Sequence, residues 1–291
     1  MATTASFRSV KFLLIRALRA ASLLRLADSF RFLLGRARVW PANRRFRAQH
    51  PQFATPPPHL AYDAVNHADW QRYLDTGLQH ARIFSRAIRD ESSPGSPLEV
   101  LEWGCGPGRL IRHMKALLPE RDLRLTGTDY NPESIAWCRQ NLPGIEFAGN
   151  ELDPPLPFAE ATFDVVYNFS VFTHLSKSVQ ESWVKELRRV LKPGGLLIST
   201  IAGEAYRYLL SAPDELAAFD TGQPVVQGNY REGRKWFLAL HPATYVRDNL
   251  FAAFADVRRL ATHPEDGIVQ EVWIARTPPG PATSARMAVA A

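Results

Sequence analysis

Short apolar segments alternate with helical segments between residues 98 and 201, and this alternation limits the possible folds more than any other feature of the chain. A strand that is followed by a helical crossover and a second strand builds a parallel sheet with helices on both faces. Near the end of the chain, Phe254–Leu260 and Ile268–Ala275 look like a final pair of strands around a Pro-Glu-Asp-Gly turn. We therefore predict a doubly wound α/β fold with a mostly parallel sheet of about seven strands and an antiparallel last strand.

Turn residues and helix caps set the bounds of these elements. Asn131, Pro132 and Glu133 open one helix with a capping side chain, a proline in the first turn and an acid near the positive end. The other predicted helices are Arg109–Leu118 and Val179–Leu191. The predicted strands before the final pair are Leu98–Trp103, Leu123–Thr128, Ile145–Ala148, Phe163–Asn168 and Gly195–Ile201.

The rest of the 291 residues divides into further segments. Prolines from Pro41 to Pro58 indicate an extended connector, so residues 1–60 are predicted to be a basic helical extension that ends in this connector. Residues 61–97 are predicted to be a helical lead-in or cap, with helical spacing over 68–90. Residues 98–276 are predicted to form the α/β domain, and residues 277–291 are predicted to form a disordered tail. Residues 202–250 are too long for a simple crossover and are predicted to be an insertion that shapes a substrate pocket.

Positive charge is concentrated near the N-terminus. Residues 1–50 contain ten arginines and Lys11 but a single acid, Asp28, whereas the whole chain has a formal net charge of +6, so the remainder is mildly acidic. We predict one or two helices over residues 7–39. A cap packed on the acidic body or over the pocket is the favoured interpretation, and peripheral attachment to anionic lipid is the second. Nucleic-acid contact is unsupported by any recognition motif, and a mitochondrial presequence is the last alternative.

Other compositional features narrow the class of protein. The apolar runs are too short and too often interrupted by charge for a spanning helix, and they do not resemble a secretory signal. Cys105 and Cys138 form neither a metal nor a disulfide pattern, so no metal site is predicted and a reducing compartment is favoured. We expect a cytoplasmic location, with peripheral membrane contact through residues 7–39 as the alternative.

A glycine-rich turn follows the first predicted strand. The strand Val100–Trp103 leads into Gly104, Gly106 and Gly108, and glycines at alternate positions let the backbone approach a ligand closely. The second predicted strand is followed directly by an acid, Asp129, which can accept hydrogen bonds from both hydroxyls of a ribose. Ligands of such sheets bind at the carboxyl ends of the strands, so both features predict a nucleoside cofactor there.

The spacing distinguishes between two nucleoside cofactors. Dinucleotide-binding turns have a last glycine three positions after the second one, but Arg109 occupies that position here. The Gly-x-Gly-x-Gly spacing is preceded by Glu102, and an acid at the turn suits the ammonium group of S-adenosylmethionine. We therefore predict S-adenosylmethionine as the cofactor.

Several segments in order resemble one family. The segment Glu102–Gly108 is similar to motif I of class I, Rossmann-like S-adenosylmethionine-dependent methyltransferases. The similarity continues through Asp129 and through the segments 150–158, 163–170 and 186–195, and covers about residues 98–201. The resemblance implies a Rossmann-like methyltransferase domain over 98–276. More loosely, residues 170–175 and the prolines near 56–60 resemble bacterial enzymes of glycan or cell-envelope pathways.

The resemblance also implies roles for the matched residues. The backbone at Gly104, Gly106 and Gly108 approaches the methionine and ribose parts of the cofactor, Glu102 faces its ammonium group, and Asp129 holds the ribose hydroxyls. The resemblance implies that Tyr130 covers the adenine and that Asn150, Glu151 and Leu152 lie at its edge. It places Asn168 and Phe169 below the sulfonium.

Methyl transfer to a hydroxyl also needs a base. His174 follows the fourth predicted strand, where substrate would lie, and histidine titrates in the suitable range. His241 in the insertion is the second candidate and His67 the third. Each of them could instead have a purely structural role.

We therefore predict an enzyme that transfers a methyl group from S-adenosylmethionine to a small-molecule, glycan or lipid-linked acceptor. One alternative is a regulatory protein that binds the cofactor without catalysis. The other is an RNA methyltransferase, which the sequence after Asn168 disfavours because it lacks an Asn-Pro-Pro-Tyr-type motif.

Overall fold

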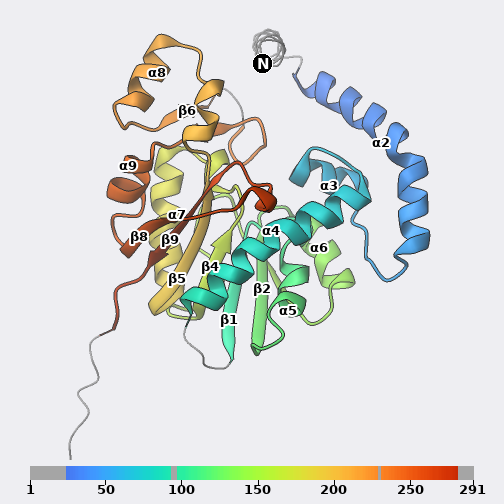
Figure 1. Ribbon diagram of the computed structural model, residues 1–291, viewed down its shortest axis with the longest axis horizontal. Coiled ribbons are helices and arrows are strands. Elements are labelled where there is room, and N and C mark those ends of the chain that lie inside the picture. Colours follow the sequence, from blue (N-terminus) through green and yellow to red (C-terminus); the bar gives the residue numbers. More distant parts are fainter. Residues whose placement is uncertain (1–23, 93–96, 229–230, 281–291) are drawn as a thin grey trace, which may run out of the picture.

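Seven strands form the central sheet of the computed structural model, which describes residues 24–92, 97–228 and 231–280 (Figure 1). The strands in chain order are β1 (Leu98–Trp103), β2 (Leu123–Asp129), β3 (Glu146–Gly149), β4 (Phe163–Asn168), β5 (Leu191–Ile201), β8 (Ala255–Leu260) and β9 (Glu271–Arg276). Their order in space is β3-β2-β1-β4-β5-β9-β8. The pairs from β3 to β5 are parallel, and β9 runs antiparallel to both β5 and β8. The predicted fold class, including the antiparallel last strand, is confirmed.

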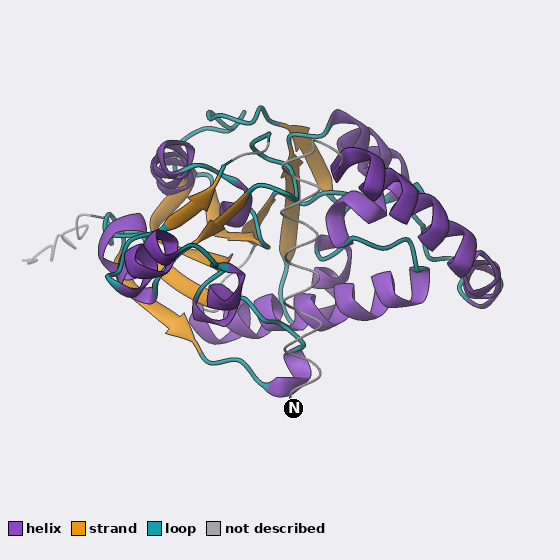
Figure 2. Cartoon of the chain, turned by 90° about the horizontal axis from the view of Figure 1, so that it is seen from above, coloured by secondary structure: helices purple, strands orange, loops and turns teal. Residues whose placement is uncertain are grey.

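Helices cover both faces of this sheet (Figure 2). On one face, α4 (Trp70–Glu91), α5 (Met114–Leu117) and α6 (Pro132–Asn141) contribute apolar side chains to one core. On the other face, α7 (Lys177–Val190) and the π-helical turn η4 (Val246–Leu250) contribute to a second core. The central strands β1, β2 and β4 are therefore buried along most of their length, as parallel strands covered on two faces should be.

The caps of two helices follow from their sequences. The Asn131 side chain accepts a hydrogen bond from Glu133 N at 3.0 Å, which confirms the predicted start of α6. Asp69 caps α4 in the same way through Arg72 N, also at 3.0 Å. The predicted helix Arg109–Leu118 is shorter than expected, because Arg109 still belongs to the glycine turn. A 3₁₀ turn, η1 (Ile111–His113), precedes the single helical turn of α5.

Helix α2 (Leu24–Gln49) corrects the predicted connector. It continues through Pro41, so the prediction of extended chain from Pro41 is wrong for residues 41–49. Tertiary contacts hold the second half of the helix despite the hydrogen bond that a proline removes. Asn43 Nδ2 donates to Ala68 O at 2.6 Å, Asn43 Oδ1 accepts from Trp70 N at 2.9 Å, and Phe46 is buried. A short helix, α3 (Pro58–Val65), follows, and the part of the predicted helix before residue 24 lies outside the described residues.

The insertion folds as a small unit beside the sheet. It contains η3 (Glu204–Leu209), α8 (Pro213–Asp220), β6 (Val225–Gln227), β7 (Leu238–Leu240) and α9 (Ala243–Tyr245). Strands β6 and β7 pair antiparallel, and Leu210, Phe219, Val225 and Leu240 form their own core.

The C-terminal segment is ordered further than predicted. Thr277 is buried, and its hydroxyl donates to Lys192 O at 2.6 Å. Residues 281–291 of the predicted tail lie outside the described residues. Among the helices of the described segments, none combines the length and the apolar character needed to span a bilayer.

Candidate functional site

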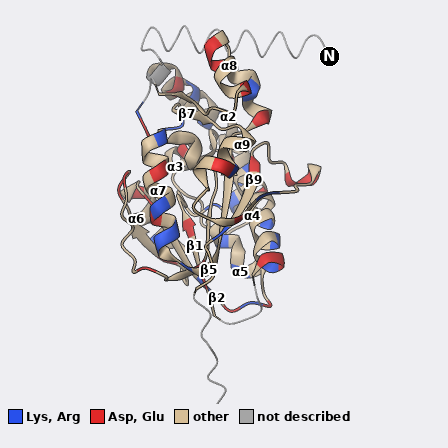
Figure 3. Ribbon diagram, turned by 90° about the vertical axis from the view of Figure 1, so that its left-hand side faces the viewer, with Lys and Arg blue, Asp and Glu red and all other residues tan. Residues whose placement is uncertain are grey.

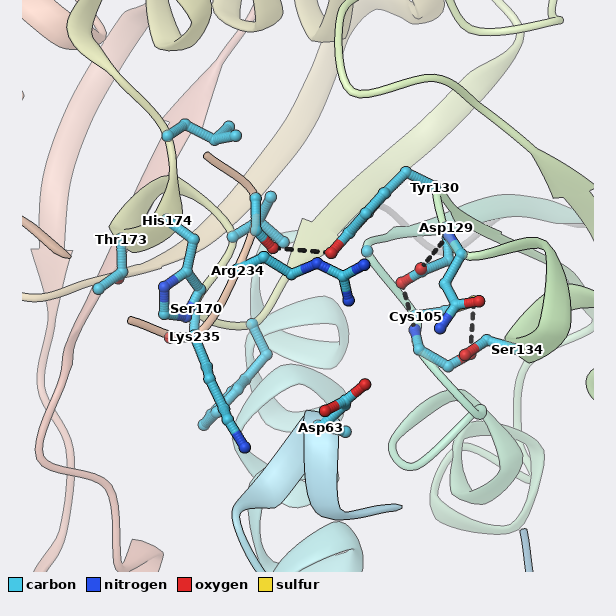
Figure 4. A pocket seen from close by; sticks show the side chains of 18 of the residues that line it. Asp63, Cys105, Asp129, Tyr130, Ser134, Ser170, Thr173, His174, Arg234 and Lys235 are labelled. Carbon is cyan, nitrogen blue, oxygen red and sulfur yellow. Dashed lines mark hydrogen bonds between the residues drawn. The ribbon is translucent and has the colours of Figure 1, made fainter. Parts of the chain in front are cut away.

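A pocket of about 770 Å³ lies at the carboxyl ends of β1, β2 and β4, where Figure 4 shows the side chains that surround it. Its size is within the range of small-molecule sites. The structure brings ten of the predicted site residues to this pocket, which are Glu102, Gly104, Gly106, Asp129, Tyr130, Asn150, Glu151, Leu152, Phe169 and His174. Three others, Gly108, Asn168 and His241, are not among its lining residues.

The glycine turn is fixed by its contacts with the end of β2. Gly104 N and Cys105 N both donate to Thr128 O, each at 2.8 Å. Gly106 N donates to Asp129 Oδ2 at 2.8 Å, and Asp129 Oδ1 accepts from Asn131 N at 2.8 Å. Burial raises the pKa of Asp129, although both backbone donors favour its charged form. The carboxylate thus joins the turn to the start of α6 and keeps lone pairs for a ligand.

Gly108 and Asn168 do not line the pocket and contact other parts of the protein. A Cβ on Gly108 would lie 2.4 Å from Leu142 Cδ1, so this glycine allows the turn to pack against the end of α6. Asn168 is buried between β4 and β5, where its Nδ2 donates to Ser199 Oγ at 2.7 Å.

Glu102 is buried beside a cation that the sequence analysis did not assign to the site. Its Oε2 accepts a hydrogen bond from Tyr167 Oη at 3.0 Å. Burial raises the pKa of Glu102 to about 8, although Tyr167 and the charge of Arg109 favour its ionised form. Arg109 is also buried and lines the pocket, with its guanidinium carbon 5.0 Å from the centre of the Phe169 ring. Arg109 stands where a dinucleotide-binding turn has its last glycine, and this position could have identified it from the sequence.

On the predicted adenine side of the pocket, only some of the polar atoms have hydrogen-bond partners. Asn150 Oδ1 is buried and has no hydrogen-bond partner among the described residues, whereas Asn150 Nδ2 donates to Glu151 O at 2.6 Å. The pocket thus offers an unused acceptor, the carboxyl groups of Asp129 and Glu102, and a turn without Cβ atoms at Gly104 and Gly106. These acceptors fit a nucleoside that carries hydroxyl and amino groups, as predicted for S-adenosylmethionine.

Residues 231–236, here called the pocket loop, connect the two sides of the pocket. Gly233 O accepts from Tyr130 Oη at 2.8 Å, and Gly233 N donates to His174 O at 2.8 Å. Glu232 accepts a hydrogen bond from Ser176 N. Arg234 points into the pocket (Figure 4). The loop comes from the insertion, so part of the insertion does form the pocket wall.

An ion pair connects the pocket loop to α2. Lys235 Nζ lies 2.7 Å from Asp28 Oδ2 and 3.9 Å from the centre of the Tyr62 ring. Tyr62 Oη also donates to Asp28 Oδ1 at 2.8 Å. Asp28 and Ser29 line the pocket, so α2 packs beside it, as the cap interpretation expects. The single acid in a basic segment was the signal that could have marked Asp28.

The candidate bases differ in their placement. His174 lines the pocket, and its Nδ1 lies 2.8 Å from Phe237 O, so Nδ1 carries the proton and Nε2 keeps its lone pair. Burial lowers the pKa of His174. His241 lies in the core, where its Nε2 contacts Gln180 Oε1 at 2.9 Å. His67 is not among the lining residues either. Of the three, only His174 reaches the pocket.

The aromatic residues of the insertion divide between two environments. Tyr206 and Trp236 line the pocket, whereas Phe237 and Tyr245 are buried in the core. Tyr208 is exposed, and Tyr230 lies outside the described residues.

Comparison with known proteins agrees with this geometry. A family model described as a methyltransferase domain matches residues 100–195. A Mycolicibacterium smegmatis protein named as an S-adenosylmethionine-dependent methyltransferase is 39% identical over 104 residues, which cover 35% of this chain and 37% of the relative. A fatty-acid O-methyltransferase of the same organism is 35% identical over 109 residues, which cover 37% of this chain and 38% of the relative.

A longer match is less similar. A malonyl-[acyl-carrier protein] O-methyltransferase of Halalkalibacterium halodurans is 29% identical over 170 residues, which cover 56% of this chain and 58% of the relative. The chain therefore spans only 37–58% of the length of these relatives.

One solved structure supports the fold alone. A chain of the complex between the Haloferax volcanii Trm112 methyltransferase activator and a methyltransferase superposes with a TM-score of 0.50 at 16% identity. The match covers 77% of this chain and 100% of that one.

Proposed function

We propose that this chain, which contains a class I S-adenosylmethionine-dependent methyltransferase domain, transfers a methyl group from S-adenosylmethionine to an oxygen of a small-molecule or lipid-related acceptor. One observation carries the proposal: a single pocket contains the glycine turn and Asp129 on one side and His174 on the other (Figure 4). The relatives named for O-methylation of a fatty acid and of a malonyl group support oxygen as the acceptor atom.

The donor side of the pocket is suited to hold and orient the cofactor. S-adenosylmethionine supplies an electrophilic methyl group on a positively charged sulfur. Asp129 would accept the ribose hydroxyls with the lone pairs that Gly106 and Asn131 leave free, and Glu102 would face the ammonium group. Asn150 Oδ1 would accept from the adenine amino group. Alignment of this kind can contribute about 7–11 kcal/mol to lowering the barrier.

The acceptor side favours a hydroxyl over a carboxylate. A hydroxyl must lose its proton as its oxygen bonds to the methyl carbon, whereas a carboxylate has no proton to lose. His174 can accept that proton at Nε2, because Nδ1 already donates to Phe237 O. Since burial lowers the pKa of His174, the ring is neutral at pH 7 and available as a base.

The test combines a search for the acceptor with a variant. Labelled S-adenosylmethionine is incubated with the protein and with fractions of its own cell extract, and the labelled hydroxyl compound is then used for kinetics. His174→Gln should lower kcat by about 10²–10⁴-fold without changing the dissociation constant of the cofactor. The matched control is His59→Gln, an exposed histidine that is not among the lining residues.

Other outcomes would contradict the proposal in distinct ways. An unchanged kcat in His174→Gln would remove His174 as the base, and a labelled carboxyl compound would remove the hydroxyl assignment. Label in the glycan or RNA fraction would point to those acceptors instead. Cofactor binding without transfer to any fraction would support the regulatory alternative.

A further inference from the structure

Helix α2 has two apolar faces, and the protein covers one of them. The inner face packs on the body of the molecule through Phe32, whose ring centre is 5.0 Å from that of Tyr62, and through the buried Phe46. Asp28 and Asn43 lie on the same side and make the polar contacts described above. Figure 1 shows α2 at the edge of the molecule, with α3 and α4 on its inner side.

The opposite face carries large apolar side chains in solvent. Their relative exposure lies between 55 and 68%, and they follow helical spacing along about four turns. We call this set the outer stripe, and it consists of Leu26, Phe30, Leu33, Leu34 and Trp40. At 100° per residue these positions span one side of the helix, away from Phe32 and Phe46. Contiguous exposed apolar residues of this kind mark an interaction surface.

Arginines border the outer stripe on both sides. Arg36 and Arg38 fall on opposite edges of it at 100° per residue, and both are exposed. Arg44 is exposed as well, and its guanidinium carbon lies 6.0 Å from the centre of the Trp40 ring. The one acid of α2, Asp28, faces inward to Lys235. The outer side of α2 is therefore apolar along its centre as far as Trp40, and cationic at its edges and, through Arg44, at its C-terminal end.

We propose that the outer stripe docks on an anionic lipid surface. A helix that lies in the membrane interface buries its apolar centre among the acyl chains, while arginines at its edges reach the phosphate groups. Two properties argue against other occupants. A nucleic-acid backbone would pair with the arginines but leave the apolar centre uncovered, and a second copy of the chain would bring two arginine-rich faces together.

Docking would also bring the pocket close to the lipid. Asp28 and Ser29 of α2 line the pocket, so its wall would lie about one helix diameter, roughly 10 Å, from the membrane surface. This inference goes beyond the proposed function and does not depend on it, because vesicle binding is measured without cofactor or acceptor.

The test is co-sedimentation of the full chain with vesicles. Vesicles of phosphatidylglycerol and phosphatidylcholine in equal parts are compared with vesicles of phosphatidylcholine alone, each at low and high salt. We expect binding to the anionic vesicles that is stronger by about tenfold or more and that weakens in high salt. Phe30→Ser combined with Leu34→Ser keeps the charge and should reduce binding by about tenfold or more.

Two further variants separate charge from apolar contact. Arg36→Gln combined with Arg38→Gln should weaken binding to anionic vesicles and reduce its dependence on salt. The matched control is Lys185→Gln combined with Arg188→Gln, which changes the net charge equally at exposed positions of α7. Figure 3 shows basic residues along α7, and Figure 1 places that helix on the other side of the molecule from α2. The control should bind like the unchanged protein.

Three results would overturn the proposal. The first is no binding of the full chain to anionic vesicles at low salt. The second is equal loss of binding in the α7 control and in the α2 arginine variant, which would make the attraction nonspecific. The third is a dimer in solution that dissociates in the Phe30→Ser and Leu34→Ser variant without vesicle binding by the unchanged protein. Circular dichroism of each variant confirms that α2 is still folded.

Discussion

Gly106 and Gly108 belong to one turn but have different tasks. Both have a positive φ, 51° and 65°, which favours glycine. A Cβ on Gly106 would find no protein atom closer than 3.8 Å, so there is room for it in the cofactor-free protein and it would occupy ligand space. A Cβ on Gly108 would instead collide with Leu142 at 2.4 Å. Gly106 thus leaves open space at the pocket, where we propose that the cofactor binds, whereas Gly108 allows the turn to pack against Leu142.

This difference gives a paired prediction. Gly106→Ala should lose only about 1–2 kcal/mol of unfolding free energy, from its backbone conformation, but should weaken cofactor binding by about tenfold or more. Gly108→Ala should be less stable, and its folded fraction should keep most of the cofactor affinity. Calorimetry and thermal unfolding measure both effects. The reverse ranking of the two variants would show that the turn has been assigned wrongly.

We expect Glu102 to couple cofactor binding to pH. Burial raises the pKa of Glu102 to about 8, so the carboxyl of the cofactor-free protein is mostly protonated at pH 7. An ammonium group bound nearby favours the ionised form and lowers this pKa. The stability of the folded, cofactor-free protein changes with pH in the opposite direction. Because the folded pKa exceeds the unfolded value, ionisation of Glu102 reduces stability as the pH rises toward 8.

We therefore expect that binding of S-adenosylmethionine releases a proton at pH 7. The affinity should rise with pH, by at most about tenfold per unit, and level off above pH 8. Glu102→Gln should abolish the proton release and should not lose stability as the pH rises. Calorimetry in two buffers with different ionisation enthalpies measures the release, and identical heats in both buffers would refute the assignment of Glu102.

At the scale of elements, an ion pair between Lys235 and Asp28 connects the pocket loop to α2. The side chains of Lys235 and Asp28 are only 14% and 16% exposed, so solvent screens the pair less than a surface ion pair. Removal of one partner would leave the other charge nearly buried without its counter-ion. Contacts of the loop with Tyr130 and His174 would then be held less firmly.

A double-mutant cycle tests this connection. Asp28→Asn and Lys235→Gln should each destabilise the protein, and the double variant should cost less than the sum by about 0.5–3 kcal/mol. Asp28→Asn should also raise the KM of the acceptor more than it lowers kcat. Additive effects of the two substitutions would show that the ion pair does not connect α2 to the loop.

The sequence predicted some elements far better than others. Leu98–Trp103 and Phe163–Asn168 match β1 and β4 to the residue, because turns bound these apolar runs clearly. The path of α2 through Pro41 was not predictable, since contacts of Asn43 and Phe46 with distant residues outweigh the local effect of proline. Local pattern sets strand bounds, whereas long-range packing decides where this helix ends.

Across the whole molecule, the sequence predicted the fold class and the edge of the sheet at which the site lies. Both follow from strand–helix alternation and from the position of Asp129 after β2. It did not predict that Asp28 and Lys235 meet beside the pocket, because no local signal joins residues so far apart in the chain. It also assigned Gly108 and Asn168 to the ligand by motif, and neither of them is among the residues that line the pocket.

The hydrogen bond from Tyr130 to Gly233 has a consequence for the order of events in each turnover. If the nucleoside is held under Tyr130, as proposed, we expect it to exchange only when the pocket loop moves, whereas the acceptor side could empty first. Turnover would then follow a compulsory order, with S-adenosylmethionine the first to arrive and S-adenosylhomocysteine the last to depart. Steady-state inhibition by S-adenosylhomocysteine should be competitive against S-adenosylmethionine and not against the acceptor.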